Sequence, residues 1–286
     1  MTSAWPFKDC LALAKPRITL MVALCAAAGY ALAPGAGDLP RLAWTLIGVA
    51  LASASTGCLN QVLESELDAK MERTRLRPIP AGRIRPGAAH GLGLLWGAAG
   101  LGLLFWKVNG VSCALTGFTL ASYLLVYTPM KRFSSWSTWV GAVPGALPPV
   151  IGWTAGGGSL DASAAALFAV QFLWQLPHFL ALGWMYREDY RCGGCRVLAV
   201  EDKSGDATRM QMSATAGLLL IVSLVPYGLG LAGAVYLAAA GAAGTAFLIV
   251  CLRAGRPLTD ASARRVFTAS LAYLPVVLGA LVLSRR

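Results

Sequence analysis

The stretch GCLNQVLESELDAKMERTRLRPIPAGR, residues 57–83, marks the point where an apolar segment gives way to a charged one. No charged residue occurs in 42–56, and another long apolar run begins after Arg85. The chain has only 13 acidic residues, yet four lie here, and six basic residues follow between Lys70 and Arg85. Such a change is typical of a transmembrane helix that ends at the membrane surface.

The composition predicts a membrane protein. The chain has 286 residues, of which 57% are hydrophobic and 13% charged, and its mean hydropathy is +0.62. A soluble protein of this size exposes far more charge. Runs of roughly 17 to 25 apolar residues can cross a hydrocarbon core of about 30 Å. We predict an all-α integral membrane protein, a single polytopic domain over residues 1–286, with nine transmembrane helices at about 17–34, 41–62, 87–106, 110–127, 136–156, 161–186, 209–230, 232–252 and 265–283.

The distribution of Lys and Arg predicts the orientation of these spans, because cytoplasmic loops hold most basic residues. With a cytoplasmic N-terminus, all 24 basic residues fall on that side except Arg41, Lys107, Arg285 and Arg286. We therefore expect the C-terminus on the outer side. The net charge of +11 reflects orientation and attraction to anionic lipid headgroups, not nucleic-acid binding. Neither a cleavable signal nor an organelle leader is evident, which favours a multi-pass protein of the bacterial inner membrane.

Three oxygen-bearing side chains share one face where the second predicted span ends. Asn60, Glu64 and Asp68 are four residues apart, and on a helix they fall within about 80° of one another. Their oxygens suit Mg²⁺, which binds carboxylates and shares its coordination shell with water and substrate phosphates. The alternative interpretation is a solvated helix end with ion pairs between residues four apart.

Basic residues follow this face on the expected cytoplasmic loop 63–86. Arg73, Arg75 and Arg77 come directly after the acidic residues. Carboxylates followed by guanidinium groups favour a diphosphate site, because a metal ion and Arg together neutralise a leaving diphosphate. The second long cytoplasmic loop is expected at 187–208, and we predict that both loops are catalytic.

A second cluster, Tyr127-Thr-Pro-Met-Lys131-Arg132, lies where the fourth predicted span ends. Its lysine could reach a phosphate, and its tyrosine ring could face an apolar chain. An aromatic belt with a positive anchor is the alternative. Beyond it, the proline-rich VPGALPPVIGW at 143–153 predicts a distorted helix whose freed carbonyls line a cavity, with aromatic walls from Trp136, Trp139 and Trp153.

A third cluster, WQLPHFLALGWMYREDY at 174–190, ends the sixth predicted span. Pro177 should kink this helix, and His178 lies about two turns inside the membrane. An ionisable residue at that depth favours a functional role, although a neutral, hydrogen-bonded structural histidine is the alternative. Glu188 and Asp189 follow at the membrane surface. The nearby pair Cys192 and Cys195 has no second Cys pair beside it, so a structural zinc site is not expected.

These motifs together resemble the UbiA-type intramembrane prenyltransferases, and within them the branch that farnesylates haem b. The resemblance rests on N60-x3-E64-x3-D68-x-K70-M71-x-R73-T74-x2-R77-P78, Y127-T-x2-K131-R132, GAVPGALPPVIGW, WQLPHF and the late ED-Y. It runs from Lys15-Pro16-Arg17 to the Phe267, Ser270 and Tyr273 of the last span. Quinone-forming members usually carry Asp-rich motifs at both sites, and Glu64 departs from that pattern in the direction of the haem branch.

The resemblance implies a nine-helix bundle in which farnesyl diphosphate ionises with the help of Mg²⁺. The 2-vinyl group of haem b then attacks the allylic cation, and water addition gives haem O for terminal oxidases. It implies Mg²⁺ ligation by Asn60, Glu64, Asp68 and Asp189. It implies diphosphate binding by Arg73, Arg77, Lys131 and Arg132. Tyr127 would stabilise the cation through its ring face, and His178 would ligate or position haem.

Alternative functions remain open on the sequence. A prenyltransferase of an aromatic quinone precursor would use the same metal site. A secondary transporter is disfavoured, since the acidic residues lie at one interface and not at the membrane centre. A membrane scaffold without catalysis is the third alternative. A haem A synthase or an oxidase assembly factor would suit the haem role as a partner, although no residue indicates one.

Overall fold

The computed structural model describes residues 7–286, and helices form all the regular secondary structure in that range apart from one isolated bridge between Ala232 and Arg285. The long helices are α2 (Pro16–Leu32), α3 (Leu39–Leu63), α5 (Pro86–Lys107), α6 (Gly110–Ser122), α10 (Ala162–Met185), α13 (Asp206–Val222), α15 (Ala234–Leu252) and α16 (Asp260–Leu283). The short ones are α1 (Phe7–Leu13), α4 (Ser65–Asp68), the π-helical turn η1 (Tyr123–Tyr127), α7 (Thr128–Met130), α8 (Ser137–Ala146), α9 (Pro148–Ala155), α11 (Arg187–Cys192), α12 (Leu198–Glu201) and α14 (Val225–Gly228).

Most of the predicted spans are present as long apolar helices. Seven helical segments between residues 7 and 286 are long and apolar enough to cross a membrane. The pair α1 and α2, bent by 50°, brings the number to eight if it forms one span. This confirms an all-α membrane architecture, while the count of nine and the direction of insertion stay predictions.

The predicted fifth span, 136–156, is a broken helix. It consists of α8 with 10 residues and α9 with 8, and each is too short to cross a hydrocarbon core by itself. The break falls at Leu147, directly before Pro148 and Pro149, whose rings remove two amide donors from the helical ladder. The sequence therefore predicted the distortion correctly but not the division into two helices.

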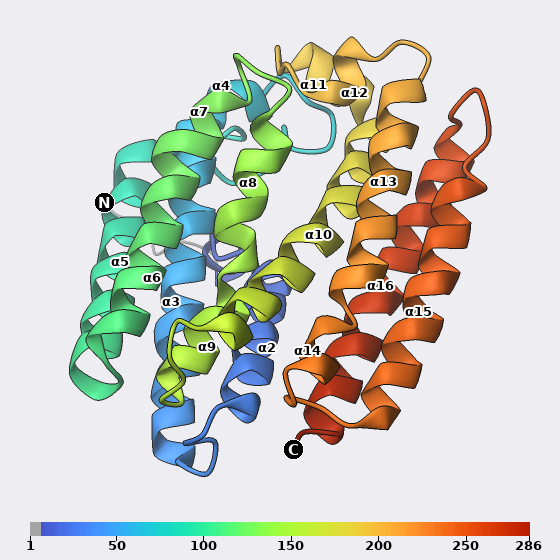
Figure 1. Ribbon diagram of the computed structural model, residues 1–286. Coiled ribbons are helices and arrows are strands. Elements are labelled where there is room, and N and C mark those ends of the chain that lie inside the picture. Colours follow the sequence, from blue (N-terminus) through green and yellow to red (C-terminus); the bar gives the residue numbers. More distant parts are fainter. Residues whose placement is uncertain (1–6) are drawn as a thin grey trace.

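The helices form two groups with α10 between them (Figure 1). One group contains α2, α3, α5, α6 and α9, in which α3 packs along α5 and α2 along α9. The other contains α13, α15 and α16, and α10 contacts both α13 and α16. The short helices α4, α7, α11 and α12 gather at one end of the bundle, which we call the loop end, and the C-terminus lies at the opposite end (Figure 1).

Two glycines allow α2 and α9 to touch through their backbones. A Cβ atom at Gly29 would lie 1.8 Å from the carbonyl oxygen of Pro149, and one at Gly152 would lie 1.8 Å from that of Ala26. Only glycine permits this approach, which is common between transmembrane helices. The contact ties the broken helix to the rest of the first group.

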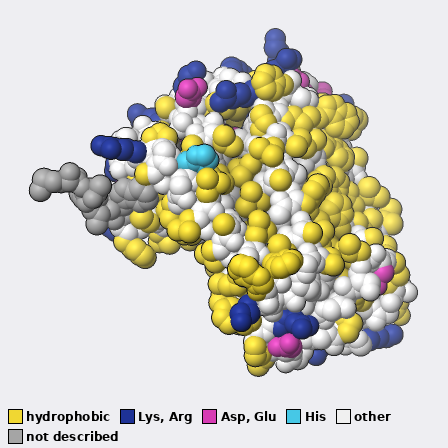
Figure 2. Space-filling view, turned by 90° about the vertical axis from the view of Figure 1, so that its left-hand side faces the viewer, with side chains coloured by type: hydrophobic (Ala, Val, Ile, Leu, Met, Phe, Trp, Pro, Cys, Tyr) yellow, Lys and Arg dark blue, Asp and Glu magenta, His cyan; other side chains and the backbone are white. Residues whose placement is uncertain are grey.

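The outer surface of the bundle is apolar across its middle. Figure 2 shows one face on which hydrophobic side chains cover a broad central area, with Lys and Arg side chains mainly toward its ends. Large apolar side chains are exposed along α5, including Leu94, Leu95, Phe105 and Trp106. A soluble protein does not leave so much apolar surface uncovered, so this face fits contact with lipid.

Candidate active site

The end of α3 presents three oxygen-bearing side chains at the loop end. The helix is interrupted at Glu64, but its hydrogen bonds continue: the amide of Glu64 donates to the Asn60 carbonyl, and the amide of Asp68 donates to the Glu64 carbonyl. The spacing of four residues therefore still places the three side chains on one face, even across the break. Asn60, Glu64 and Asp68 are 2%, 7% and 1% exposed, which is unlike the solvated helix end of the alternative interpretation.

Each of these three side chains contacts a cation from another part of the chain. Lys15 donates from Nζ to Oδ1 of Asn60 at 2.7 Å. Nζ of Lys131 lies 2.7 Å from Oε1 of Glu64. The guanidinium group of Arg77 donates from Nη1 to Oδ2 of Asp68 at 2.6 Å. The fold thus brings four separate segments together at one buried cluster.

The ionised pair of Glu64 and Lys131 is stable despite its burial. Burial opposes ionisation of the Glu64 carboxyl, but the adjacent Lys131 ammonium outweighs it, and the pKa of Glu64 lies below its ordinary value of 4.5. Burial likewise opposes the charge on Lys131, yet the oxygens of Tyr127 and Glu64 hold its pKa well above the ordinary value. Both groups are therefore charged at neutral pH.

The donor set fits Mg²⁺. One amide and two carboxylate side chains offer the hard oxygen ligands that this ion prefers, and the cations that now contact them show that the position favours positive charge. No group of three or more His, Cys, Asp or Glu side chains suited to a metal occurs among residues 7–286. Asp189 accordingly does not complete a group of three carboxylates with Glu64 and Asp68, and it accepts from the amide of Glu72 instead.

The other predicted diphosphate ligands lie nearer to solvent. Arg73 is exposed, and its guanidinium stacks 4.9 Å from the ring centre of Tyr186. Arg132 is also exposed. Arg73 follows α4 and Arg132 follows α7 in the chain, and both of these short helices lie at the loop end (Figure 1).

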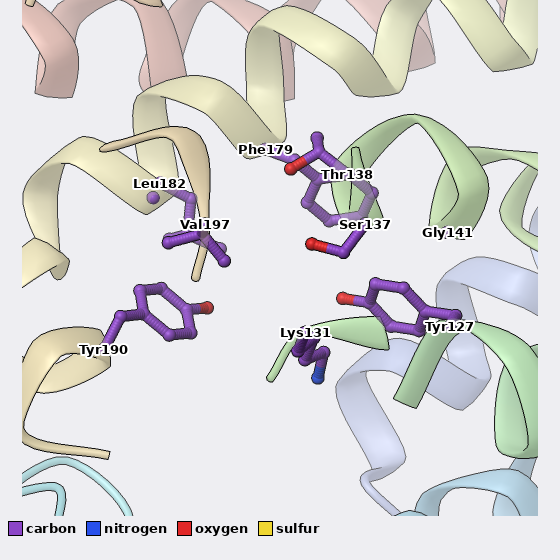
Figure 3. Close-up of a pocket in the computed structure, with 10 residues that line it drawn as sticks. Tyr127, Lys131, Ser137, Thr138, Gly141, Phe179, Leu182, Tyr190 and Val197 are labelled. Carbon is purple, nitrogen blue, oxygen red and sulfur yellow. The ribbon is translucent and has the colours of Figure 1, made fainter. Parts of the chain in front are cut away.

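A small pocket adjoins this cluster. Ten residues line it: Tyr127, Lys131, Ser137, Thr138, Gly141, Phe179, Leu182, Gly183, Tyr190 and Val197. Figure 3 shows the hydroxyl groups of Tyr127 and Tyr190 pointing toward each other across the opening. The Lys131 ammonium lies 4.6 Å from the ring centre of Tyr127. An apolar wall from α10 and a cationic corner therefore lie side by side.

The tryptophans expected to wall the cavity do not line this pocket. Trp153 is buried and donates to the Ser159 carbonyl, Trp139 donates to Gln211, and Trp136 is exposed. The prediction failed because the break between α8 and α9 leaves Trp153 beside the turn at Ser159. Phe179 and the two tyrosines take the place of the tryptophans.

His178 lies among aromatic side chains on α10, partly buried. Its ring stacks on Trp174 and on Phe267, with ring centres 5.2 and 4.7 Å apart. Nδ1 lies 2.8 Å from Oγ of Ser270 on α16. The Ser270 hydroxyl donates its only proton to the Phe267 carbonyl. The hydrogen bond between His178 and Ser270 therefore needs a proton on Nδ1. Nε2 is then the atom with a free lone pair.

A sequence profile of the UbiA prenyltransferase family matches residues 22–274, most of the chain. The chain belongs to this family. Among its relatives are proteins named protoheme IX farnesyltransferase. The one from Opitutus terrae is 43% identical over 98% of this chain and 95% of its own length. That from Solibacter usitatus is 43% identical over 97% and 99%, and that from an Anaeromyxobacter species is 44% identical over 98% and 94%.

Solved structures of UbiA-type proteins share this fold. One concerned with digeranylgeranylglyceryl phosphate synthase matches with a TM-score of 0.81 at 17% identity and covers 97% of both chains. A UbiA homologue from Archaeoglobus fulgidus, solved with GPP and Mg²⁺, matches with a TM-score of 0.67 at 14% identity, over 96% of this chain and 99% of that one. At such identities the likeness concerns the fold of the family.

The sequence did not single out three residues that the fold places at these sites. Lys15 was noted only as one of the basic residues that indicate topology and as the first residue of the resemblance, directly before Pro16. Tyr190 and Ser270 were noted only as parts of motifs. Nothing in their spacing indicates that they meet Tyr127 and His178, because these contacts join distant helices. Cys192 is exposed and Cys195 buried, and both are free thiols without a role here.

Proposed function

We propose that this protein transfers the farnesyl group of farnesyl diphosphate to the 2-vinyl group of haem b and, with the addition of water, forms haem O for terminal oxidases. The names of relatives that match nearly the whole chain support this reaction. The observation that carries it is the buried cluster in which three cations meet Asn60, Glu64 and Asp68. An allylic diphosphate and its metal need such a mixture of charges.

In this proposal Asn60, Glu64 and Asp68 hold Mg²⁺, with Asp189 as an outer contributor. The ion supplies positive charge that stabilises the departing diphosphate. Arg73, Arg77, Lys131 and Arg132 bind the diphosphate oxygens, and the two exposed arginines attract it from solvent. A Mg²⁺ requirement agrees with the solved UbiA homologue bound to GPP and Mg²⁺.

The chemistry separates charge and then restores it. The C–O bond of farnesyl diphosphate breaks with both electrons on the diphosphate, and the vinyl π electrons form the new C–C bond to the allylic carbon. Water captures the resulting cation next to the porphyrin and releases one proton. Tyr127 and Phe179 line the pocket beside Lys131, and their rings would stabilise positive charge through their π electrons.

Haem would bind beside Nε2 of His178. The histidine would serve either as an axial ligand of the iron or as a positioning contact. We also propose that the N-terminus and the loop end face the cytoplasm of a bacterial inner membrane, as the Lys and Arg distribution predicts. The product would pass to a haem A synthase or an oxidase assembly factor. A prenyltransferase of a quinone precursor is the competing function.

The test is a reaction with purified protein in detergent, farnesyl diphosphate, Mg²⁺ and either haem b or 4-hydroxybenzoate. We expect haem O, identified by its mass, and no prenylated benzoate. Prenylated benzoate without haem O would contradict the proposal. Removal of Mg²⁺ with a chelator should stop the reaction.

A further inference from the structure

His178 lies between the pocket and helix α16. Its ring meets the ring of Phe179, which lines the pocket, edge to face with centres 5.4 Å apart. On its other side Phe267 of α16 stacks on the same imidazole, with ring centres 4.7 Å apart. A flat ligand much larger than the imidazole that binds beside His178 therefore has one edge toward the pocket and the opposite edge toward α16.

The shape of haem b decides which of its edges faces α16. Two vinyl groups lie on one edge of the porphyrin, and two propionates lie on the opposite edge. In the proposed reaction the 2-vinyl group must reach the allylic diphosphate at the pocket, beside Lys131. The propionates then point away from the pocket, toward α16. As carboxylates they also belong at the membrane surface, because a charge inside the hydrocarbon core is costly.

Helix α16 has an arginine at this place. The helix begins with Asp260 at the loop end (Figure 1), and Arg264 follows one turn later with an exposed side chain. Arg264 lies about 4.5 Å nearer to the loop end than Phe267 and about 60° from it around the helix axis. Its guanidinium group is therefore placed between the aromatic ring and the membrane surface, on the same side of the helix.

Arg264 has no carboxylate partner in the fold. Asp260 precedes it by four residues, a spacing that permits a helical ion pair, but the Asp260 carboxylate pairs with Arg187 beyond the end of α10. None of the ion pairs in the described part of the chain includes Arg264. The pair of Arg187 and Asp260 also joins the ends of α10 and α16 on the loop-end side of His178. An uncompensated positive charge is thus held beside the proposed haem position.

We propose that Arg264 binds a propionate of haem b and thereby directs the 2-vinyl edge to the pocket. Arginine suits this role because its guanidinium group stays charged and can donate two parallel hydrogen bonds to one carboxylate. The inference rests on the proposed function and adds to it a substrate-binding residue. It also adds a preference for porphyrins whose propionates are free acids.

The experiment measures the binding of two haems that differ only at the propionates. Purified protein in detergent is titrated with haem b and with its dimethyl ester, and the absorption of bound haem gives each dissociation constant. Arg264→Met keeps an unbranched aliphatic chain and removes the guanidinium group. Arg265→Met is the matched control, because Arg265 is also exposed but lies about 160° from Phe267 around the same helix.

We expect Arg264→Met to bind haem b roughly fivefold to tenfold more weakly than the native protein, because it loses a charge-assisted hydrogen bond. Its affinity for the dimethyl ester should stay within about twofold of the native value, since the ester has no carboxylate that an arginine could pair with. Arg264→Lys should recover part of the affinity for haem b. Arg265→Met should match the native protein with both haems.

The native protein supplies a second measurement that needs no variant. Rising salt should weaken the binding of haem b and leave that of the dimethyl ester unchanged, because salt screens an ion pair at the membrane surface. This titration decides even if Arg264→Met does not fold.

Three results would overturn the inference. The first is an Arg264→Met variant that loses affinity equally for both haems or for neither. The second is an equally large loss in Arg265→Met, and the third is a native affinity for haem b that does not respond to salt. Failure of the proposed function has a different signature, in which the native protein shows the Arg264-dependent preference for haem b but forms no haem O.

Discussion

His178 and Ser270 lie 92 residues apart in the sequence, yet Nδ1 of the histidine is 2.8 Å from Oγ of the serine. Because the Ser270 hydroxyl donates its only proton to the Phe267 carbonyl, its oxygen accepts from Nδ1 of His178. The histidine is therefore held in the tautomer with the proton on Nδ1. A hydrogen bond of this kind commonly orients a metal-binding histidine from behind. It leaves Nε2 without this contact, as the proposed haem role of His178 requires.

Substitution at this pair should change the spectrum of bound haem. We expect His178→Ala to lose the absorption and paramagnetic resonance signature of nitrogen-ligated haem. Ser270→Ala should keep ligation but lower haem affinity by roughly tenfold, because the ring loses its orienting acceptor. Ser284→Ala, whose hydroxyl bonds only to its own helix, is the control. A native-like spectrum in His178→Ala would show that the histidine does not ligate iron.

Asp68→Asn should abolish haem O formation while the protein still enters the membrane. The amide keeps the shape of the side chain but removes the charge that pairs with Arg77 at 2.6 Å, and turnover should fall at least about 100-fold. The measurement is extracted haem composition together with the amount of protein in membranes. Glu66→Gln, at an exposed position two residues away, should retain activity. Normal haem O in Asp68→Asn would contradict the metal assignment.

The Glu64–Lys131 pair should stabilise the fold over a wide pH range. Because the pKa of Glu64 is lowered, its contribution is complete above the ordinary value of 4.5 and is lost as the pH falls through the lowered pKa. Because the pKa of Lys131 is raised, its contribution is complete below the ordinary value of 10.5 and is lost as the pH rises through the raised pKa. Between those two values the contribution should be constant.

Thermal unfolding of native and Glu64→Gln protein in detergent tests this. Removal of one partner leaves a buried ammonium unpaired, so the variant should be less stable by about 3 kcal/mol at neutral pH. The difference should stay level from mildly acidic to mildly alkaline pH and shrink in acid. A difference that instead grew below the ordinary Glu pKa would mean that the carboxyl is neutral in the fold.

Gly29→Ala should destabilise the contact between α2 and α9. Its new methyl group would lie 1.8 Å from a backbone oxygen of Pro149, which a rotamer change cannot relieve, and the free energy of unfolding should fall by at least about 2 kcal/mol. Gly91→Ala, with nothing within 4 Å of the new atom, should be neutral or stabilising. Equal stability of the two variants would show that the helices separate readily.

The sequence by itself determined the features that depend on local spacing and composition. Apolar runs identified most of the helices, since the length of a helix that crosses a membrane is set by the thickness of the hydrocarbon core. A period of four placed Asn60, Glu64 and Asp68 on one face, because helical hydrogen bonds fix the angle between residues. Prolines indicated the distorted fifth span.

Only the tertiary structure decided what these residues contact. Lys15 meets Asn60 across 45 residues, Lys131 meets Glu64 across 67, and His178 meets Ser270 across 92. Such pairs depend on how helices pack and where they bend, which side-chain periodicity does not encode. For the same reason the predicted tryptophan walls were replaced by Tyr127, Tyr190 and Phe179. The pattern of residues in the sequence determines which face of a helix is polar. The packing of the helices determines which residues that face contacts.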